Sequence, residues 1–90
     1  MNLKFSIITV VFNSEPALVK TINSIRKQSC TDIEYIIIDG CSTDGTLDVI
    51  KKYDKYISFW CSEPDEGIYD AMNKGLKKAT GNYVWFLNAG

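Results

Sequence analysis

The chain has 90 residues, ten basic and eleven acidic side chains and a formal net charge of −1, so it can form at most one small domain or part of a larger one. The near balance of charge argues against a nucleic-acid partner. The absence of histidine excludes, within this chain, a His general base, a Ser-His-Asp triad and the usual zinc sites.

Three scattered cysteines, Cys30, Cys41 and Cys61, form neither a CxxC pair nor an even set, which indicates a reducing compartment. The apolar stretch near the N-terminus, residues 5–12, is too short to span a membrane. We therefore expect a cytoplasmic protein.

The first half of the chain predicts two strands, each followed by a helix. An apolar run over residues 4–12 predicts a strand, and a helix should begin behind Ser14, with Pro16 in its first turn. A second strand is expected over residues 34–39, before a helix capped by Thr46. The residues expected to face inward from the two helices are Leu18, Ile22, Ile25, Leu47, Ile50 and Tyr53.

The second half continues the alternation. A short strand is expected over residues 57–61, a helix over residues 68–79 closed by Gly81, and a last strand over residues 82–87. Tyr83, Trp85 and Leu87 alternate along this last strand, which favours a place in the core.

The order β-α-β-α-β-α-β predicts an α/β protein with three layers: a mainly parallel, Rossmann-like sheet with helices on both faces. We expect the open side of the last strand to make the chain prone to self-association.

The segment after the second strand is the most informative one. The apolar run Tyr35-Ile36-Ile37-Ile38 ends in Asp39-Gly40, followed by a polar loop. In open α/β sheets, ligands bind at the carboxyl ends of the strands, so Asp39 is expected at the lip of a crevice, able to accept hydrogen bonds from a ligand. Asp-Gly is also a common turn dipeptide, and a purely structural role stays open.

Several nucleotide-binding motifs are absent. The sequence has no GxGxxG, no GxxxxGK[ST] and no GxSxG elbow. A receiver domain would need an acidic pair after the first strand, where the chain has Val11-Phe12-Asn13. A nucleotide or sugar-nucleotide fold without a P-loop is therefore favoured.

Five segments are expected to lie together at the edge of the sheet where the strands end. They are the end of the first strand, the Asp39 loop, SEPD after the third strand, GIYDAMNKG and FLNAG. In order and spacing they resemble the N-terminal, nucleotide-binding half of the family 2 glycosyltransferases, inverting enzymes of the GT-A fold. The resemblance runs over nearly the whole chain and is strongest to bacterial enzymes of surface-polysaccharide assembly.

The resemblance implies roles for single residues. Val11 and Asn13 would lie beside the base and ribose of the donor, Val11 through its backbone, and Asp39 would accept from the uracil imide of a UDP-sugar. Asp65 and Lys74 would line the donor pocket, and Asn73 matches a characteristic helix residue. The alternatives are that Asn13 is first a turn former and only then a ligand contact, and that Lys74 is a surface lysine.

The resemblance also implies what lies outside residues 1–90. Asn88 stands at the start of the acidic DXD-type motif and is not acidic, so no metal ligand and no catalytic residue is expected in this chain. The carboxylate for Mg²⁺ or Mn²⁺, the general base and the acceptor site would come later. The chain would thus be a partial GT-A domain, inactive alone.

The implied reaction transfers a sugar with inversion to a saccharide or lipid-linked acceptor, in the cytoplasm or at the inner face of a membrane. Two alternatives stay open: a non-catalytic α/β interaction or regulatory module, and a nucleotidyltransferase. The latter is disfavoured because residues 13–16 contain no basic side chain to hold phosphate.

Overall fold

The structure, a computed structural model, describes residues 4–27, 32–64 and 66–88. Its elements alternate as expected: β1 (Phe5–Val11), α1 (Glu15–Arg26), β2 (Ile33–Asp39), α2 (Thr46–Lys52), the short 3₁₀ helix η1 (Asp54–Tyr56), β3 (Phe59–Ser62), α3 (Ile68–Lys78) and β4 (Tyr83–Phe86). Among these residues, no helix is long and apolar enough to cross a membrane.

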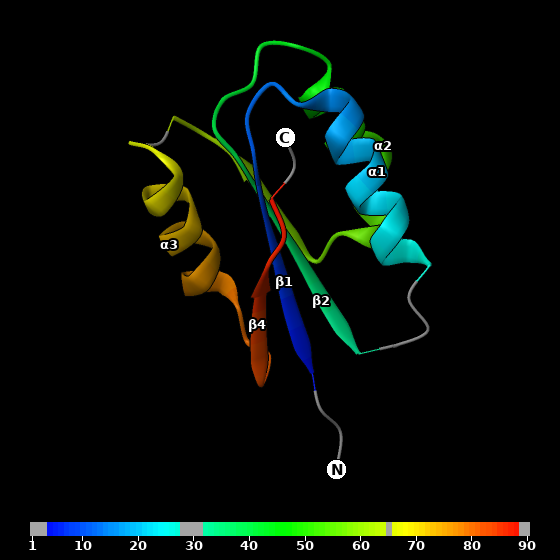
Figure 1. Cartoon of the computed structure of the whole chain (residues 1–90), viewed down its shortest axis with the longest axis vertical. Helices are drawn as coiled ribbons and strands as arrows, with labels where there is room; N and C mark the ends of the chain where they lie inside the picture. Colours follow the sequence, from blue (N-terminus) through cyan, green and yellow to red (C-terminus); the bar gives the residue numbers. More distant parts are fainter. Residues whose placement is uncertain (1–3, 28–31, 65, 89–90) are drawn as a thin grey trace.

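The four strands form one parallel sheet in the order β3-β2-β1-β4. Figure 1 shows α1 and α2 on one face of the sheet and α3 on the other, so the predicted three-layer α/β class is confirmed. All four strands point toward the same edge, at the top of Figure 1, which we call the carboxyl edge.

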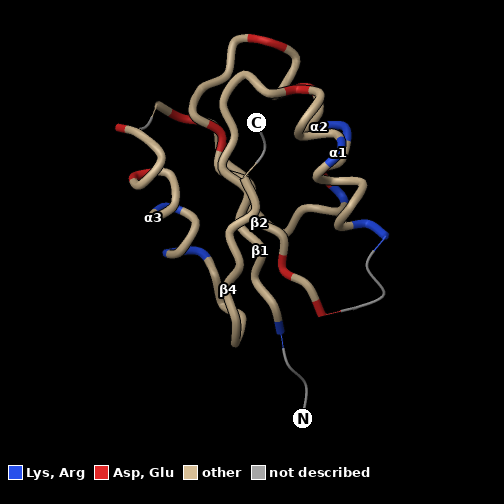
Figure 2. Tube along the Cα trace, viewed as in Figure 1, with Lys and Arg blue, Asp and Glu red and all other residues tan. Residues whose placement is uncertain are grey.

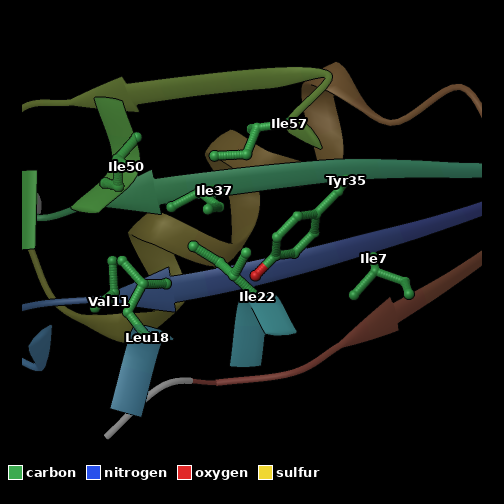
Figure 3. Packing of buried hydrophobic residues seen from close by; sticks show 8 residues of the cluster. All are labelled: Ile7, Val11, Leu18, Ile22, Tyr35, Ile37, Ile50 and Ile57. Carbon is green, nitrogen blue, oxygen red and sulfur yellow. The ribbon is translucent and has the colours of Figure 1, made fainter. Parts of the chain in front are cut away.

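The sheet separates two apolar clusters, because successive side chains of a strand point to opposite faces. The larger cluster lies under α1 and α2 and contains Ile7, Val11, Leu18, Ile22, Tyr35, Ile37, Ile50 and Ile57 (Figure 3). The smaller lies under α3 and contains Ile8, Ile36, Ile38 and Ala71. The long apolar run of β2 thus contributes to both, as expected for a strand buried on two sides.

At two helix ends, the capping residue differs from the one expected from the sequence. Thr46 is the first residue of α2, not its cap; it is buried, and its hydroxyl accepts a hydrogen bond from the Ser14 N–H at 3.1 Å. Gly81 does not close α3, which ends at Lys78 with Ala79 as the capping residue. A Cβ at Gly81 would lie 2.8 Å from the Lys4 carbonyl oxygen, so this glycine permits the close approach of the chain to β1.

The prediction that the alternating residues in and just after β4 lie in the core is wrong. Tyr83, Trp85 and Leu87 are 52%, 60% and 42% exposed. The reason is the sheet order: β4 is an edge strand, and α1 and α2 pack over β1 and β2 instead. The opposite face of β4 is the one that joins a cluster, through Val84.

Candidate functional site at the carboxyl edge

Backbone hydrogen bonds join the strand ends at the carboxyl edge. The N–H of Gly40, just after β2, donates to the Val11 carbonyl at 3.0 Å, and the N–H of Glu63, just after β3, donates to the Asp39 carbonyl at 3.0 Å. Segments that are far apart in the sequence therefore leave the sheet side by side, as the predicted constellation requires.

Asp39 does not lie at the lip of a crevice, which corrects the sequence-based expectation. Its side chain has no exposed surface. Oδ2 accepts from the Ser42 N–H at 3.0 Å and from the Ser62 hydroxyl at 2.7 Å, and Oδ1 accepts from the Ser42 hydroxyl. A buried carboxylate needs such donors; two come from Ser42 in the loop after β2 and the third from Ser62 at the end of β3. In this arrangement, a ligand cannot reach Asp39.

Asn13 joins the loop after β1 to the loop after β2. Its Oδ1 accepts from the N–H groups of Thr43 at 2.7 Å and Asp44 at 3.3 Å, while its own N–H donates to the Ser42 hydroxyl at 2.8 Å. The backbone of Asn13 is left-handed, with φ of 46°, a conformation that Asn tolerates better than most residues. The side chain is exposed, but its oxygen is already used within the protein.

The two residues before Asn13 differ in exposure. Val11 is 1% exposed and belongs to the larger cluster, and its carbonyl already accepts from the Gly40 N–H, so this residue is closed to a ligand in this arrangement. The neighbouring Phe12, directly after β1, is 57% exposed. Its aromatic side chain is available as an apolar surface.

The segment after β3 is held by α3. The Lys74 ammonium lies 3.1 Å from a Glu63 carboxylate oxygen and 3.5 Å from an Asp70 carboxylate oxygen, and it donates to the Pro64 carbonyl at 3.0 Å. Desolvation acts to lower the pKa of Lys74, but the Glu63 and Asp70 carboxylates outweigh it and raise that pKa above its ordinary value. Lys74 is therefore a charged lysine with its partners in place.

Two other predicted site residues receive less support from the geometry. Asn73 lies next to Lys74 on α3 and is exposed. Asp65 lies outside the described residues.

The charged side chains described at this edge are mostly acidic. Figure 2 shows acidic segments along the loops at the top of the molecule. Asp44, in the loop after β2, and Glu63 and Glu66, after β3, are exposed. Within the described ranges, no group of three or more His, Cys, Asp or Glu side chains is placed to hold a metal ion. Asn88, the residue at the start of the expected metal motif, is exposed and neutral. These residues do not form a metal site by themselves.

Both cysteines among the described residues are free thiols. Cys41 is exposed in the loop after β2, and its backbone is left-handed, with φ of 68°. Burial, followed by the charge of Glu63, raises the pKa of the Cys61 thiol. Cys30 lies outside the described residues.

Sequence reasoning missed the importance of two serines. The sequence indicates only a polar loop around Ser42 and assigns no separate role to Ser62, yet both donate to Asp39. The spacing of Asp39 and Ser42, three residues apart, is a signal for such a local side-chain-to-backbone bond. Nothing in the sequence indicates that Ser62, 23 positions away, completes the set.

Comparisons with known proteins agree with this geometry. The family model described as "Glycosyl transferase family 2" matches residues 6–89. An uncharacterized glycosyltransferase of Mycobacterium tuberculosis is 41% identical over 85 residues, covering 93% of this chain and 32% of that protein. The putative teichuronic acid biosynthesis glycosyltransferase TuaG of Bacillus subtilis is 39% identical, covering 93% of this chain and 34% of that protein.

A solved structure of a similar protein has the same fold over nearly the whole of this chain. The crystal structure of S. aureus TarS residues 1–349 in complex with UDP-GlcNAc superposes with a TM-score of 0.86 at 33% identity, covering 96% of this chain and 26% of that one. The chain spans about a third of the length of the curated relatives named above.

Proposed function

Because the chain belongs to glycosyl transferase family 2, we propose that it forms the nucleotide-binding part of an enzyme that takes a sugar from a nucleoside-diphosphate donor. A UDP-sugar is the favoured donor, since TarS, whose fold this chain shares, was crystallised with UDP-GlcNAc. One observation carries the proposal: the ends of β1, β2 and β3 lie side by side at one edge. The Gly40–Val11 and Glu63–Asp39 backbone hydrogen bonds join them. Such an edge is where open α/β sheets bind ligands.

The base and ribose are proposed to pack beside the segment Val11-Phe12-Asn13. Phe12 offers an exposed side chain, on which a base can stack, and the exposed Asn13 lies next to it in the chain. Asn73 and Lys74 are proposed to line the donor pocket from α3, together with Asp65. Lys74 is suited to this role because its charge is fixed in place by Glu63 and Asp70.

The charge of the edge bears on how a diphosphate would bind. The exposed carboxylates of Asp44, Glu63 and Glu66 oppose an anion, and a hard divalent cation relieves such repulsion. Since the described residues do not form a metal site, we propose that the carboxylates for Mg²⁺ or Mn²⁺ belong to the DXD-type motif beyond residue 90. On this proposal, residues 1–90 are part of a GT-A domain that continues further.

The proposed reaction is transfer with inversion to a hydroxyl of a saccharide or lipid-linked acceptor. It needs a base to take the acceptor proton and stabilisation of an oxocarbenium-like transition state. None of the described residues is assigned to those steps, so we expect no turnover by this chain alone. Bacterial polysaccharide biosynthesis, in the cytoplasm or at the inner face of the membrane, is the proposed setting, in keeping with the name of TuaG.

A titration tests the proposal. The chain is titrated with UDP, uridine and ADP, each with and without Mn²⁺, by calorimetry. Uridine binding that ADP does not reproduce is expected, and Lys74→Ala should weaken the binding of UDP. Lys77→Ala on the same helix is the matched control, because Lys77 is exposed and makes none of the Lys74 contacts. If no uridine compound binds, the chain is better explained as a non-catalytic interaction module.

A further inference from the structure

The Ser42 hydroxyl bridges Asp39 and Asn13. It donates to Asp39 Oδ1 and accepts from the Asn13 N–H at 2.8 Å. Asn13 in turn accepts from the Thr43 N–H at 2.7 Å. The end of β2, the loop after it and the end of β1 are thereby connected in one continuous set of hydrogen bonds.

The direction of these bonds depends on an acceptor-only group at position 39. A hydroxyl has one proton to donate, and an ionised carboxylate can only accept, so the Ser42 proton points at Asp39. Its lone pairs are then free for the Asn13 N–H. An amide in place of the carboxylate would turn its NH₂ either toward the Ser42 hydroxyl or toward the Ser42 N–H and the Ser62 hydroxyl, and at least one donor would lose its acceptor in either case.

A further hydrogen bond holds Asp39 from β3, on the same oxygen that accepts the Ser42 N–H. The Ser62 hydroxyl donates to Oδ2 at 2.7 Å from the end of β3. The β3 end would stay attached without this hydroxyl, since the Glu63 N–H also donates to the Asp39 carbonyl. Ser62 thus contributes to holding the carboxylate but does not touch the loop after β1.

We propose that Asp39 is a positioning residue for donor binding: acting through Ser42, its carboxylate holds Asn13 and residues 41–44 in the arrangement that receives the base. It does not contact the donor itself, because it has no exposed surface and its oxygens are occupied. This inference rests on the proposed function, and it replaces direct recognition of uracil by Asp39.

The test compares Ser42→Ala, Ser62→Ala, Asp39→Asn and Ser42→Thr by UDP titration, with amide hydrogen exchange of Thr43 and Asp44 in the free chain. Ser42→Ala and Asp39→Asn should each weaken UDP binding by about tenfold, the effect of one lost positioning hydrogen bond, and speed the exchange of Thr43. Ser62→Ala should stay within about twofold of the unaltered chain. Ser42→Thr keeps the hydroxyl and should restore affinity.

Two results would overturn the inference. A loss of affinity in Asp39→Asn with none in Ser42→Ala would mean that the carboxylate meets the donor directly. An equal loss in Ser62→Ala and Ser42→Ala would mean that the bonds matter only for general stability. Failure of the proposed function is distinguishable: the unaltered chain would then bind no UDP, and the donor role of Asp39 would fail with it. The exchange of Thr43 would still decide whether Asp39 and Ser42 hold the loop.

Discussion

Gly75 of α3 lies directly against Ile8 of β1: a Cβ at position 75 would be 2.5 Å from Cγ2 of Ile8. Both residues are buried, and Ile8 is β-branched and enclosed by its cluster, so its methyl group has no free direction in which to move. The glycine therefore sets how closely α3 approaches the sheet, and with it the position of Lys74 one residue earlier.

Gly75→Ala is expected to destabilise the fold by about 1–2 kcal/mol. Alanine gains about 1 kcal/mol of helix propensity, but overpacking typically costs about 1–3 kcal/mol, and the contact with Ile8 places this site at the costly end. Urea unfolding measures the change, with the exposed Lys77→Ala as the control, expected within about 0.5 kcal/mol. A Gly75→Ala chain more stable than the original would show that α3 can move away from β1.

The buried Tyr35 should make stability fall at alkaline pH. Burial raises the pKa of its phenol from 10.0 to about 12, although the hydrogen bond with the Thr9 hydroxyl at 2.8 Å acts to lower it. The folded state then keeps a proton that the unfolded state has lost, so stability is complete below pH 10 and falls between pH 10 and about 12.

The loss due to Tyr35 should reach on the order of 2–3 kcal/mol, since one pKa unit corresponds to about 1.4 kcal/mol. It is measured as the difference in unfolding free energy between the original chain and Tyr35→Phe across this range. The contributions of the other tyrosines and of the lysines cancel in this difference, because these residues titrate in both chains. A difference that is independent of pH would contradict the burial of this hydroxyl.

Glu34 should support stability at neutral pH but not in acid. Its carboxylate joins the starts of β1, β2 and β4 by accepting from the Ser6 hydroxyl at 2.7 Å and the Thr80 N–H at 2.8 Å. Burial acts to raise the pKa of Glu34, but these bonds, that of the Thr80 hydroxyl and the charge of Lys4 together lower it below its usual 4.5. The stabilisation is therefore present above pH 4.5 and lost as pH falls through the lower folded value.

Glu34→Gln is expected to cost about 1–3 kcal/mol at pH 7, the usual loss for hydrogen bonds to a charged group. Below pH 4.5 the difference between the two chains should shrink. Thermal unfolding at several pH values measures it. A constant difference from pH 7 to pH 3 would argue against an ionised Glu34 as the cause.

The β4 edge is expected to make the chain self-associate. Among the described strands, β4 pairs only with β1, so its other side presents unpaired backbone groups beside the exposed Trp85 and Leu87. Sedimentation should show a mass that rises with concentration, and Trp85→Lys should reduce the rise by adding charge at the edge. A clean monomer at all concentrations would contradict this expectation.

The sequence was sufficient to predict those features of the fold that depend on the pattern of a single strand. The unbroken apolar run of β2 predicts a strand buried on both faces, and its pairing with helices on either side followed from the alternation of elements. The order of the strands in the sheet could not be predicted from the sequence, and therefore the exposure of Trp85 could not be predicted either. Alternation along a strand identifies two faces, but it does not tell which face a helix covers.

The site was predicted at the level of segments rather than side chains. Asp39 was correctly placed at the end of β2, but its burial depends on Ser62, which no local pattern connects to it. Asn13 was recognised as a turn former and a candidate contact, and the structure shows the turn role directly. Such long-range bonds arise only once the strands are side by side, which is why residue patterns alone do not reveal them.

The most direct test of the account is a map of backbone amide NMR shifts on adding UDP to the chain. We expect the shifts to concentrate at residues 11–14 and 40–45, with smaller ones around Lys74, and to be absent from the ends of α1 and α2 at the opposite edge of the sheet. Shifts gathered instead on the exposed face of β4, or no saturable shifts at all, would contradict a donor site at the carboxyl edge.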